Sequence, residues 1–396
     1  MTMILNCGCG RHLNEFEGGR LIVKDGVKIL DLHGGWKEMG RQYGCLGQED
    51  LLAVMDYLCM EVGEPELRNG CGFDSSSRSF QVLELADKLY CKYPENLKLV
   101  FEGMAETSGL TLEQLKIINA VEYAEGLFAC SGVAVWDEYS ADGKVVYGRN
   151  YDAMHYGELA KQVAITVYHP NDGSLAVATI GHIGEIYAVN GFNEKGLFLE
   201  LNNGMSTTGF DLDWTITPST TELLELMFRA KNMDDLDCFF KETPSFAGFI
   251  IGVADAHEAR AYEWSREGTL RGDGILDVEQ APEGFEPKQG VSVVTNHFVN
   301  PDWNCPVFCN GDVFCSMPRR RNIARFLEEN KGRIDADMMM KFMGTPIGEG
   351  GPAFKKEEGK DPQTLYQMVV MPEKKQLYLQ VSGNNSWTLV DLGQYL

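Results

Sequence analysis

The sequence has few of the features that mark membrane proteins, exported proteins and cofactor-dependent enzymes. Its 396 residues contain no run of about 18 apolar residues, so no transmembrane helix is predicted. Residues 1–13 contain no apolar core of the kind found in signal peptides, so export is not expected. No G-x-x-x-x-G-K-[ST] loop and no H-x-x-x-H pair occur, which argues against phosphate binding and a helical zinc site. We therefore expect a protein that needs no cofactor and no metal.

Basic residues are scarce relative to acidic ones. The chain has 35 Lys and Arg against 58 Asp and Glu, which gives a formal net charge of −23. Such a surface repels nucleic acid and anionic membranes, because those partners are bound by neutralising Lys and Arg side chains. We expect neither of them as a partner.

The eleven cysteines are scattered and odd in number. Without an export signal they indicate reduced thiols in the cytoplasm; the alternative is an exported protein whose signal peptide is missing from the sequence. Two closely spaced groups contain metal-ligand residue types: Cys7, Cys9 and His12, and Cys305, Cys309 and Cys315. Because neither group has paired C-x-x-C spacing, neither predicts a zinc site.

The spacing of apolar residues changes at Cys130. Between about residues 36 and 127 apolar residues recur with the helical period, and Thr111 with Gln114 forms a capping box. From Cys130 onward short β-type runs follow one another across turns such as Asp142-Gly143. The predicted strands include 131–136, 144–149, 163–168, 175–180, 186–189 and 197–201, and the later helices are 220–230, 233–240, 319–329 and 336–343. Hairpins followed by blocks of helix predict an α+β fold.

Cys130 lies where this change occurs, at the opening of the first hairpin. Pairing across Asp142-Gly143 would bring Arg149 and Asp152 back beside it. If the chain breaks before Cys130, the new α-amino group can act as the base for its own thiol. Asp152 could then orient the ammonium, and Arg149 could stabilise the thiolate or a substrate carboxylate. From residue types alone, a buried structural cysteine and a surface ion pair explain the same pattern.

Several motifs from residue 130 onward resemble two related enzyme families. They are C-S-G-V at 130–133, D-G-K-V-V-Y-G-R-N-Y-D at 142–152, G-F-N-E-K-G-L at 191–197 and V-V-T-N-H-F at 293–298. They resemble the choloylglycine hydrolases, which include bile-salt hydrolases and penicillin-V acylases, and the isopenicillin-N acyltransferase-like family. Both are N-terminal-nucleophile cysteine hydrolases. The resemblance implies a four-layer αββα sandwich of two antiparallel sheets.

Two segments before residue 130 resemble the second family more closely. They are G-G-W-K-E-M-G at 34–40, continuing to Tyr43-Gly44, and F-E-G-M-A-E-T-S-G-L at 101–110. The resemblance implies that residues 1–129 are a helical prosegment, which stays associated after cleavage. Residues 130–396 would be the catalytic domain, beginning at the nucleophile.

The same resemblance assigns the site residues. It implies that Cys130 is the nucleophile and that Arg149 and Asp152 are its neighbours. It further implies that Asn202 or Asn203 supplies one oxyanion donor, and that Asn296 supports the tetrahedral intermediate. A later arginine of the choloylglycine hydrolases falls in the run 319–321, where the sequence leaves it unassigned.

The implied function is self-processing hydrolysis of a linear, non-peptide amide bond in a small N-acyl substrate, through a Cys130 thioester. Bile-salt conjugates, penicillins, acyl-amino acids and β-alanyl amines would all suit this chemistry. An acyltransferase that passes the acyl group to an amine is the first alternative, and a catalytically silent binding protein is the second. Whether the protein forms a homo-oligomer is left open.

Overall fold

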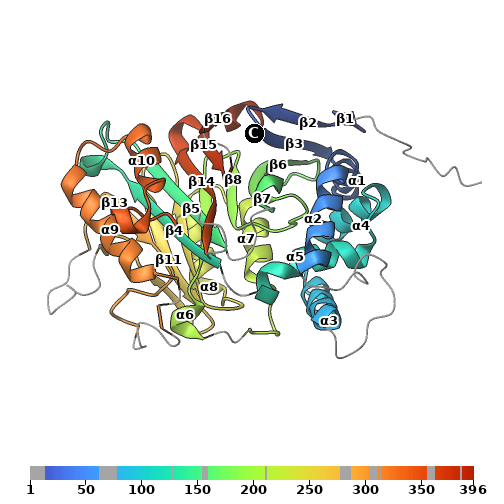
Figure 1. The fold of residues 1–396 in the computed structure, drawn as a ribbon, viewed down its shortest axis with the longest axis horizontal. Coiled ribbons are helices and arrows are strands. Elements are labelled where there is room, and N and C mark those ends of the chain that lie inside the picture. Colours follow the sequence, from blue (N-terminus) through green and yellow to red (C-terminus); the bar gives the residue numbers. More distant parts are fainter. Residues whose placement is uncertain are drawn as a thin grey trace, which may run out of the picture.

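The computed structural model describes residues 14–61, 78–125, 128–153, 159–209, 212–276, 287–303, 311–312, 314–354, 362–383 and 386–396. They form an α+β fold built on two sheets of ten and six strands (Figure 1). Among the described strands the pairings are antiparallel except for one, the parallel pair β3–β6.

The ten-stranded sheet begins with three strands from the N-terminal part of the chain. Its order is β1 (Glu15–Phe16), β2 (Gly19–Lys24), β3 (Val27–Gly34), β6 (Val163–Pro170), β7 (Val177–His182), β8 (Asn190–Asn193), β9 (Phe198–Asn203), β10 (Phe249–Ala254), β11 (Ala259–Ser265) and β12 (Gly268–Arg271). The N-terminal part of the chain therefore contributes strands as well as the helices expected from the sequence.

The six-stranded sheet carries the hairpin that contains Cys130. Its order is β13 (Val291–Val294), β4 (Phe128–Val135), β5 (Val146–Ala153), β14 (Gln363–Met371), β15 (Gln376–Val381) and β16 (Thr388–Asp391). The β4–β5 hairpin forms as predicted, with Cys130 opposite Tyr151. β4 starts three residues earlier than the predicted strand 131–136, so Cys130 is its third residue.

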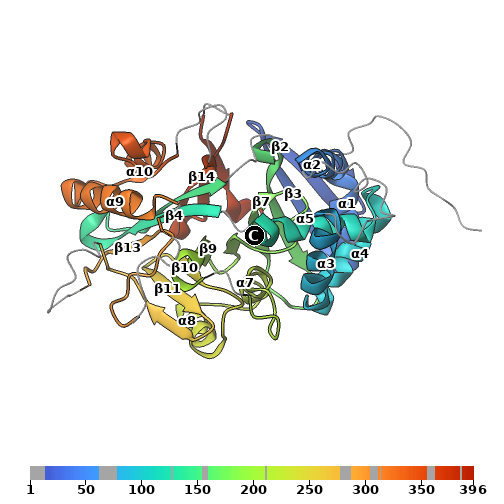
Figure 2. The same ribbon diagram turned by 60° about the horizontal axis from the view of Figure 1, so that its bottom comes forward.

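The helices form two groups on opposite sides of the molecule (Figures 1 and 2). On one side lie α1 (Trp36–Leu46), α2 (Gln48–Glu61), α3 (Arg78–Cys91), α4 (Glu95–Thr107) and α5 (Leu112–Glu125). On the other side α9 (Ser316–Asn330) and α10 (Ala336–Met343) pack on the six-stranded sheet. The remaining helices are α6 (Met205–Thr208), α7 (Ser219–Met227) and α8 (Met233–Glu242). No helix of the described residues is long and apolar enough to cross a membrane.

Two details of the sequence prediction have different outcomes. The capping box is confirmed: Gln114 N–H donates to Thr111 Oγ1 (3.2 Å), and Thr111 N–H donates to Gln114 Oε1 (2.9 Å). The strand expected at 186–189 is wrong, because these residues form no strand. Ile186 N–H donates to Asn119 Oδ1 (2.7 Å) and Ala188 N–H to Thr220 O (3.1 Å), so these donors bind outside any sheet. The apolar residues at 186–189 are buried, but they do not pair as a strand.

Side chains alternate along β4 between the two faces of its sheet. Val133 and Val135 belong to the cluster that contains residues of α9 and α10, whereas Cys130 and Ala134 belong to the core cluster that the ten-stranded sheet shares. Gly132 lies between Cys130 and Ala134 on that second face. A Cβ built on Gly132 would lie 1.7 Å from Glu200 Oε1 of β9. The missing side chain therefore allows the two sheets to approach beside Cys130.

This close approach predicts that Gly132→Ala is destabilising. The added methyl group must displace Glu200, and overpacking of this kind costs about 1–3 kcal/mol. Gly348→Ala is the matched control, because no atom lies within 4 Å of its added Cβ. Urea denaturation should be measured in a Cys130→Ala background, which prevents any cleavage before residue 130 from interfering. Equal free energies of unfolding for the two variants would contradict the tight packing.

Candidate active site

Cys130 is buried between the two sheets. Its residue is 2% exposed, and its backbone N–H donates to Asn296 Oδ1 at 3.0 Å. Its carbonyl oxygen accepts a hydrogen bond from Arg319. Both backbone polar groups of Cys130 are thus bound by buried side chains from elsewhere in the sequence.

Arg149 lies fully buried on the same face of the hairpin. Its Nε donates to Asn190 Oδ1 (3.0 Å), Nη1 to Asn202 Oδ1 (2.6 Å) and Nη2 to Leu201 O (2.8 Å). Nη1 also lies 2.6 Å from Glu200 Oε2, so a buried ion pair joins the two sheets. Although burial opposes the charge, the nearby Cys130 and Glu200 keep the pKa of Arg149 above its ordinary value. The guanidinium is therefore a fixed positive charge beside the thiol.

The structure distinguishes the two asparagines that the sequence left open. Asn202 points between the sheets, where its Oδ1 accepts from Arg149 and its Nδ2 donates to Glu200 Oε1 (3.2 Å). The Asn203 side chain instead accepts from Met205 N–H (2.8 Å) at the start of α6. The backbone carbonyl of Asn203 accepts from Asn296 Nδ2 at 2.8 Å. Asn202 is therefore placed by its side chain near Arg149, and Asn203 contributes its backbone.

Asp152 is buried at the end of β5. Its Oδ1 accepts from Thr364 Oγ1 at 2.5 Å, and its Oδ2 lies 3.7 Å from Arg319 Nη1. Burial raises the pKa of Asp152 to about 6, against the opposing effects of Arg319, Thr364 and Arg149. This carboxyl group can therefore gain or lose a proton near neutral pH.

Hydrogen bonds on both sides fix the orientation of the Asn296 amide. Its Oδ1 accepts from Cys130 N–H and from the Arg319 guanidinium, which can only donate. Its Nδ2 donates to Asn203 O. The sequence analysis gave Asn296 a donor role toward an oxyanion, whereas here its oxygen holds the nitrogen of the nucleophile. An amide nitrogen carries two hydrogens, and Asn203 O takes one of them.

The structure also separates the three consecutive arginines at the start of α9. Arg319 is buried and bonds Cys130 O, Asn296 Oδ1 and Phe314 O. Arg320 is buried elsewhere, where it donates to Val293 O and Ile275 O. Arg321 is exposed. Helical geometry turns consecutive residues about 100° apart, so only one of the three faces Cys130.

The thiol is neutral in the uncleaved chain. Burial raises the pKa of Cys130 to about 12, and the charges of Asp152 and Glu200 act in the same direction, whereas Arg149 opposes them. A neutral thiol is a weak nucleophile, so chemistry at Cys130 needs a base within reach.

Several polar residues of this network were not identified from the sequence, Asn190 among them. Glu200 pairs with Arg149, Thr364 binds Asp152, and Ser316 Oγ accepts from Asn296 N–H at 2.7 Å. Glu200 carried a signal, because an acidic residue within the apolar run F-L-E-L at 198–201 must find a buried partner. Thr364 and Ser316 carried none, since both are ordinary residue types, one in a strand and the other in the first turn of a helix.

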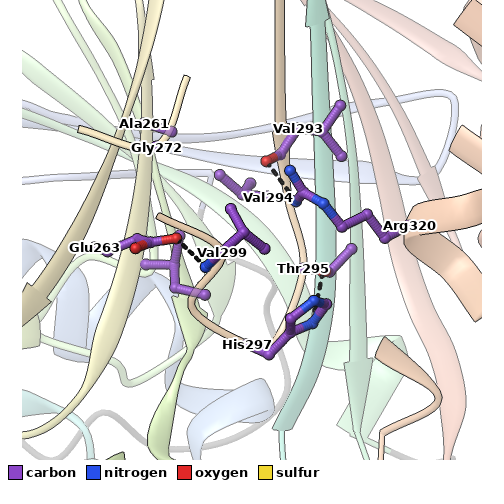
Figure 3. A pocket seen from close by; sticks show the side chains of 10 residues that line it. Ala261, Glu263, Gly272, Val293, Val294, Thr295, His297, Val299 and Arg320 are labelled. Carbon is purple, nitrogen blue, oxygen red and sulfur yellow. Dashed lines mark hydrogen bonds between the residues drawn. The ribbon is translucent and has the colours of Figure 1, made fainter. Parts of the chain in front are cut away.

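A small pocket lies between β11, β13 and the Thr295–Val299 segment (Figure 3). It is too small to hold a water molecule and is lined by Glu263, His297 and Arg320 among others. Glu263 accepts hydrogen bonds from the N–H groups of Val299 and Asn300, so it fixes the chain directly after Asn296. Burial raises the pKa of Glu263 to about 7, although these two N–H groups and Arg320 act in the opposite direction.

No model of a protein family and no curated protein matches the sequence. Several solved structures are similar to it. A mutant of the conjugated bile acid hydrolase from Clostridium perfringens is 16% identical, over 67% of this chain and 93% of its own, with a TM-score of 0.47. The Caenorhabditis elegans ortholog of N-acylethanolamine-hydrolyzing acid amidase is 16% identical over 62% and 93%, with a TM-score of 0.44. Penicillin V acylase from Agrobacterium tumefaciens is 11% identical over 66% and 86%, with a TM-score of 0.42.

The bile acid hydrolase and the penicillin V acylase bear names of the choloylglycine hydrolases, which the motifs of this sequence resemble. At these identities and TM-scores the similarity alone decides neither the fold nor the activity of this chain. Of the cysteines considered as metal ligands, Cys7, Cys9, Cys305 and Cys309 lie outside the described residues, as does His12.

The network around Arg319 predicts that Arg319→Lys is strongly destabilising. A lysine cannot reproduce the planar fork, so Cys130 O, Asn296 Oδ1 and Phe314 O would lose donors. We expect a loss of at least about 2 kcal/mol, because each buried acceptor left unpaired costs about 1–3 kcal/mol. The exposed Arg321→Lys change is the matched control and should stay within about 0.5 kcal/mol. Urea denaturation in the Cys130→Ala background measures both, and equal losses would contradict this role of Arg319.

Glu263→Gln should become increasingly stabilising, relative to the wild-type residue, as the pH rises. The glutamate ionises at its ordinary pKa of 4.5 when unfolded and at about 7 when folded, so its ionisation weakens the folded state between these values. At about 1.4 kcal/mol per pH unit, the change is on the order of 3 kcal/mol. Denaturation at about pH 4.5 and about pH 8 measures it, with the exposed Glu267→Gln as control. If the free energies of unfolding of Glu263→Gln and of the wild type differ by the same amount at both pH values, a raised pKa at Glu263 is excluded.

Proposed function

We propose that this chain is a self-processing amidohydrolase that cleaves a linear, non-peptide amide bond of a small N-acyl substrate through a Cys130 thioester. One observation carries the proposal: Asn296 Oδ1 binds the backbone nitrogen of Cys130, with Arg319 on the same oxygen and Asp152 beside Arg319. A structural cysteine needs only to fill space. Here buried polar side chains surround the nitrogen that cleavage would convert into an amine.

Maturation would begin at the peptide bond between Ala129 and Cys130. The Sγ atom of Cys130 adds to the carbonyl carbon of Ala129, and the bond from this carbon to the Cys130 nitrogen breaks. The product is a thioester between Ala129 and Cys130 Sγ, with the nitrogen protonated to an amine. Water hydrolyses the thioester, leaving a carboxylate on Ala129, a free thiol and a free α-amino group. Ala129 is fully buried next to the thiol, which keeps the two reacting groups adjacent.

The mature site would then use the same atoms on a substrate. The α-amino group takes the proton of the thiol, and the thiolate adds to the substrate's amide carbon. The ammonium returns the proton to the leaving nitrogen, and the amine departs. Water attacks the resulting thioester with the α-amino group as base, which releases the carboxylic acid and restores the thiol.

The surrounding side chains have separable roles in this proposal. Arg149 stabilises the thiolate, and Asp152, whose charge acts on Cys130, would hold the ammonium that forms during turnover. Asn296 keeps the nitrogen in position and can offer its second amide hydrogen to an oxyanion. Asn202 is the better of the two adjacent asparagines for the other donor, because its side chain lies between the sheets near Arg149.

The proposal includes a four-layer αββα arrangement with residues 1–129 as a retained prosegment. Packing of α9 and α10 on one sheet, and of α7 and α8 against strands of the other, supports the layers. The pairing of β3 with β6 supports retention, because it joins a strand from before residue 129 to the ten-stranded sheet. Separating them would expose buried residues such as Ile29, Leu30 and Leu32.

Two other functions could use the same fold: acyl transfer to an amine, and binding without catalysis. If an amine instead of water intercepts the thioester, the same site is an acyltransferase. A catalytically silent binding protein would have no need for the buried charges, because burying Arg149, Glu200 and Asp152 costs free energy that an apolar core avoids. The free-energy cost of burying these charges therefore favours an enzyme over a silent binding protein.

The maturation step has a direct test. Purified wild-type protein should yield fragments of 129 and 396 − 129 = 267 residues by intact-mass analysis, whereas Cys130→Ala should remain one chain. The wild-type protein should then hydrolyse members of a panel of linear N-acyl amides, with acid and amine products detected by mass spectrometry. Adding a primary amine to the assay separates acyl transfer from hydrolysis.

Cys59→Ala is the control for this experiment, since Cys59 is also a buried cysteine but lies in α2. It should leave both cleavage and hydrolysis intact. An uncleaved wild-type chain that still hydrolyses amides would refute self-processing. A Cys130→Ala protein with full activity would refute the nucleophile itself.

A further inference from the structure

Asp31, His33 and His169 form a cluster away from Cys130, at the junction of the N-terminal strands with the rest of the ten-stranded sheet. Asp31 and His33 are two residues apart on β3 and share one face, and His169 of β6 is in register with His33. Nε2 of His33 lies 3.0 Å and Nε2 of His169 lies 2.9 Å from Asp31 Oδ1. The three ligand atoms lie within 4.8 Å of one another.

These distances suit adjacent ligands of one metal ion. With bonds of about 2.0–2.1 Å to nitrogen and oxygen, neighbouring ligands of a tetrahedral ion are about 3.3 Å apart. Two imidazoles with one carboxylate are a common donor set for divalent transition metals. The set differs from the acidic oxygen clusters that bind Ca²⁺ or Mg²⁺.

The Asp31 carboxylate is oriented toward the two histidines by a contact with Arg20. Arg20 Nη2 lies 2.6 Å from Asp31 Oδ2, which leaves Oδ1 facing the two imidazoles. Hydrogen-bonded partners of this kind orient metal-binding carboxylates in many sites.

Access from solvent comes from the histidine side. The side chains of His33 and His169 are 42% and 24% exposed, whereas that of Asp31 is 2% exposed. The two rings stack at 4.1 Å with planes 6° apart, so their in-plane lone pairs do not meet at one point. Binding would require one ring to turn, and the more exposed His33 has the freedom to do so.

We propose that Asp31, His33 and His169 bind a divalent transition-metal ion such as Zn²⁺ or Co²⁺. The ion links β3 to β6, the one parallel pair among the described strands. Its binding needs no cleavage of the chain. If the maturation proposed above takes place, two ligands come from the first fragment and one from the second. The ion then holds the two fragments together.

Titration of the full chain with Co²⁺ tests the site, with the thiols kept reduced. Imidazole and carboxylate ligation of Co²⁺ gives visible d–d bands without the intense near-ultraviolet band of a thiolate ligand. This separates the site from the chain's cysteines. We expect one such ion per chain, and an affinity at least about tenfold weaker in His33→Ala and in His169→Ala. The exposed His257→Ala is the matched control and should bind as the wild type does.

Two further measurements make the outcome decisive. Co²⁺ should raise the melting temperature of the wild type and of His257→Ala, but not of the two ligand variants, since an ion that binds the folded state stabilises it. Melts without metal show whether each variant folds. Cys130→Ala should bind Co²⁺ with unchanged affinity, so failure of the proposed hydrolysis would leave this result standing. A wild type without the d–d bands, or variants that bind as the wild type does, would overturn the site.

Discussion

The buried ion pair between Arg149 and Glu200 is the constraint on which the centre of this protein depends. Both side chains are fully buried, and their charged atoms are 2.6 Å apart across the space between the sheets. Burying such charges costs free energy, and hydrogen bonds with Asn190, Asn202, Leu201 and Tyr147 offset part of that cost. The glycine at position 132 follows from the same constraint, because any larger residue would displace Glu200.

The ion pair also sets the electrostatic state of Cys130. Arg149 favours a thiolate, but burial and the acidic groups outweigh it, so the thiol in the intact chain stays protonated. A neutral thiol needs a base beside it before it can turn over a substrate amide. Cleavage at residue 129 would supply that base from the nucleophile's own backbone, at a nitrogen that Asn296 already binds. In this interpretation, cleavage supplies the base for substrate turnover that the uncleaved chain lacks.

Sequence reasoning worked best where the signal was local. The capping box at Thr111, the Asp142-Gly143 hairpin and the helix at 336–343 each depend on neighbouring residues, and each is present. It failed at 186–189, where buried apolar residues bind a helix and a side chain instead of a strand. The N-terminal strands at 15–34 were not anticipated, although Asp25-Gly26 between β2 and β3 is a local hairpin signal of the same kind. Only their place beside β6 depends on residues more than a hundred positions later.

For the site, the sequence by itself determined which residue types were available and which hairpin would bring Arg149 and Asp152 toward Cys130, because turn chemistry fixes strand pairing. Only the tertiary structure decided which of the three arginines at 319–321 reaches Cys130, and which of Asn202 and Asn203 points between the sheets. Only it revealed Glu200 as the partner of Arg149, and Asn296 Oδ1 as the acceptor for the nucleophile's nitrogen. Each of these depends on the direction of a side chain after helices and sheets have packed, and a one-dimensional pattern does not specify that direction.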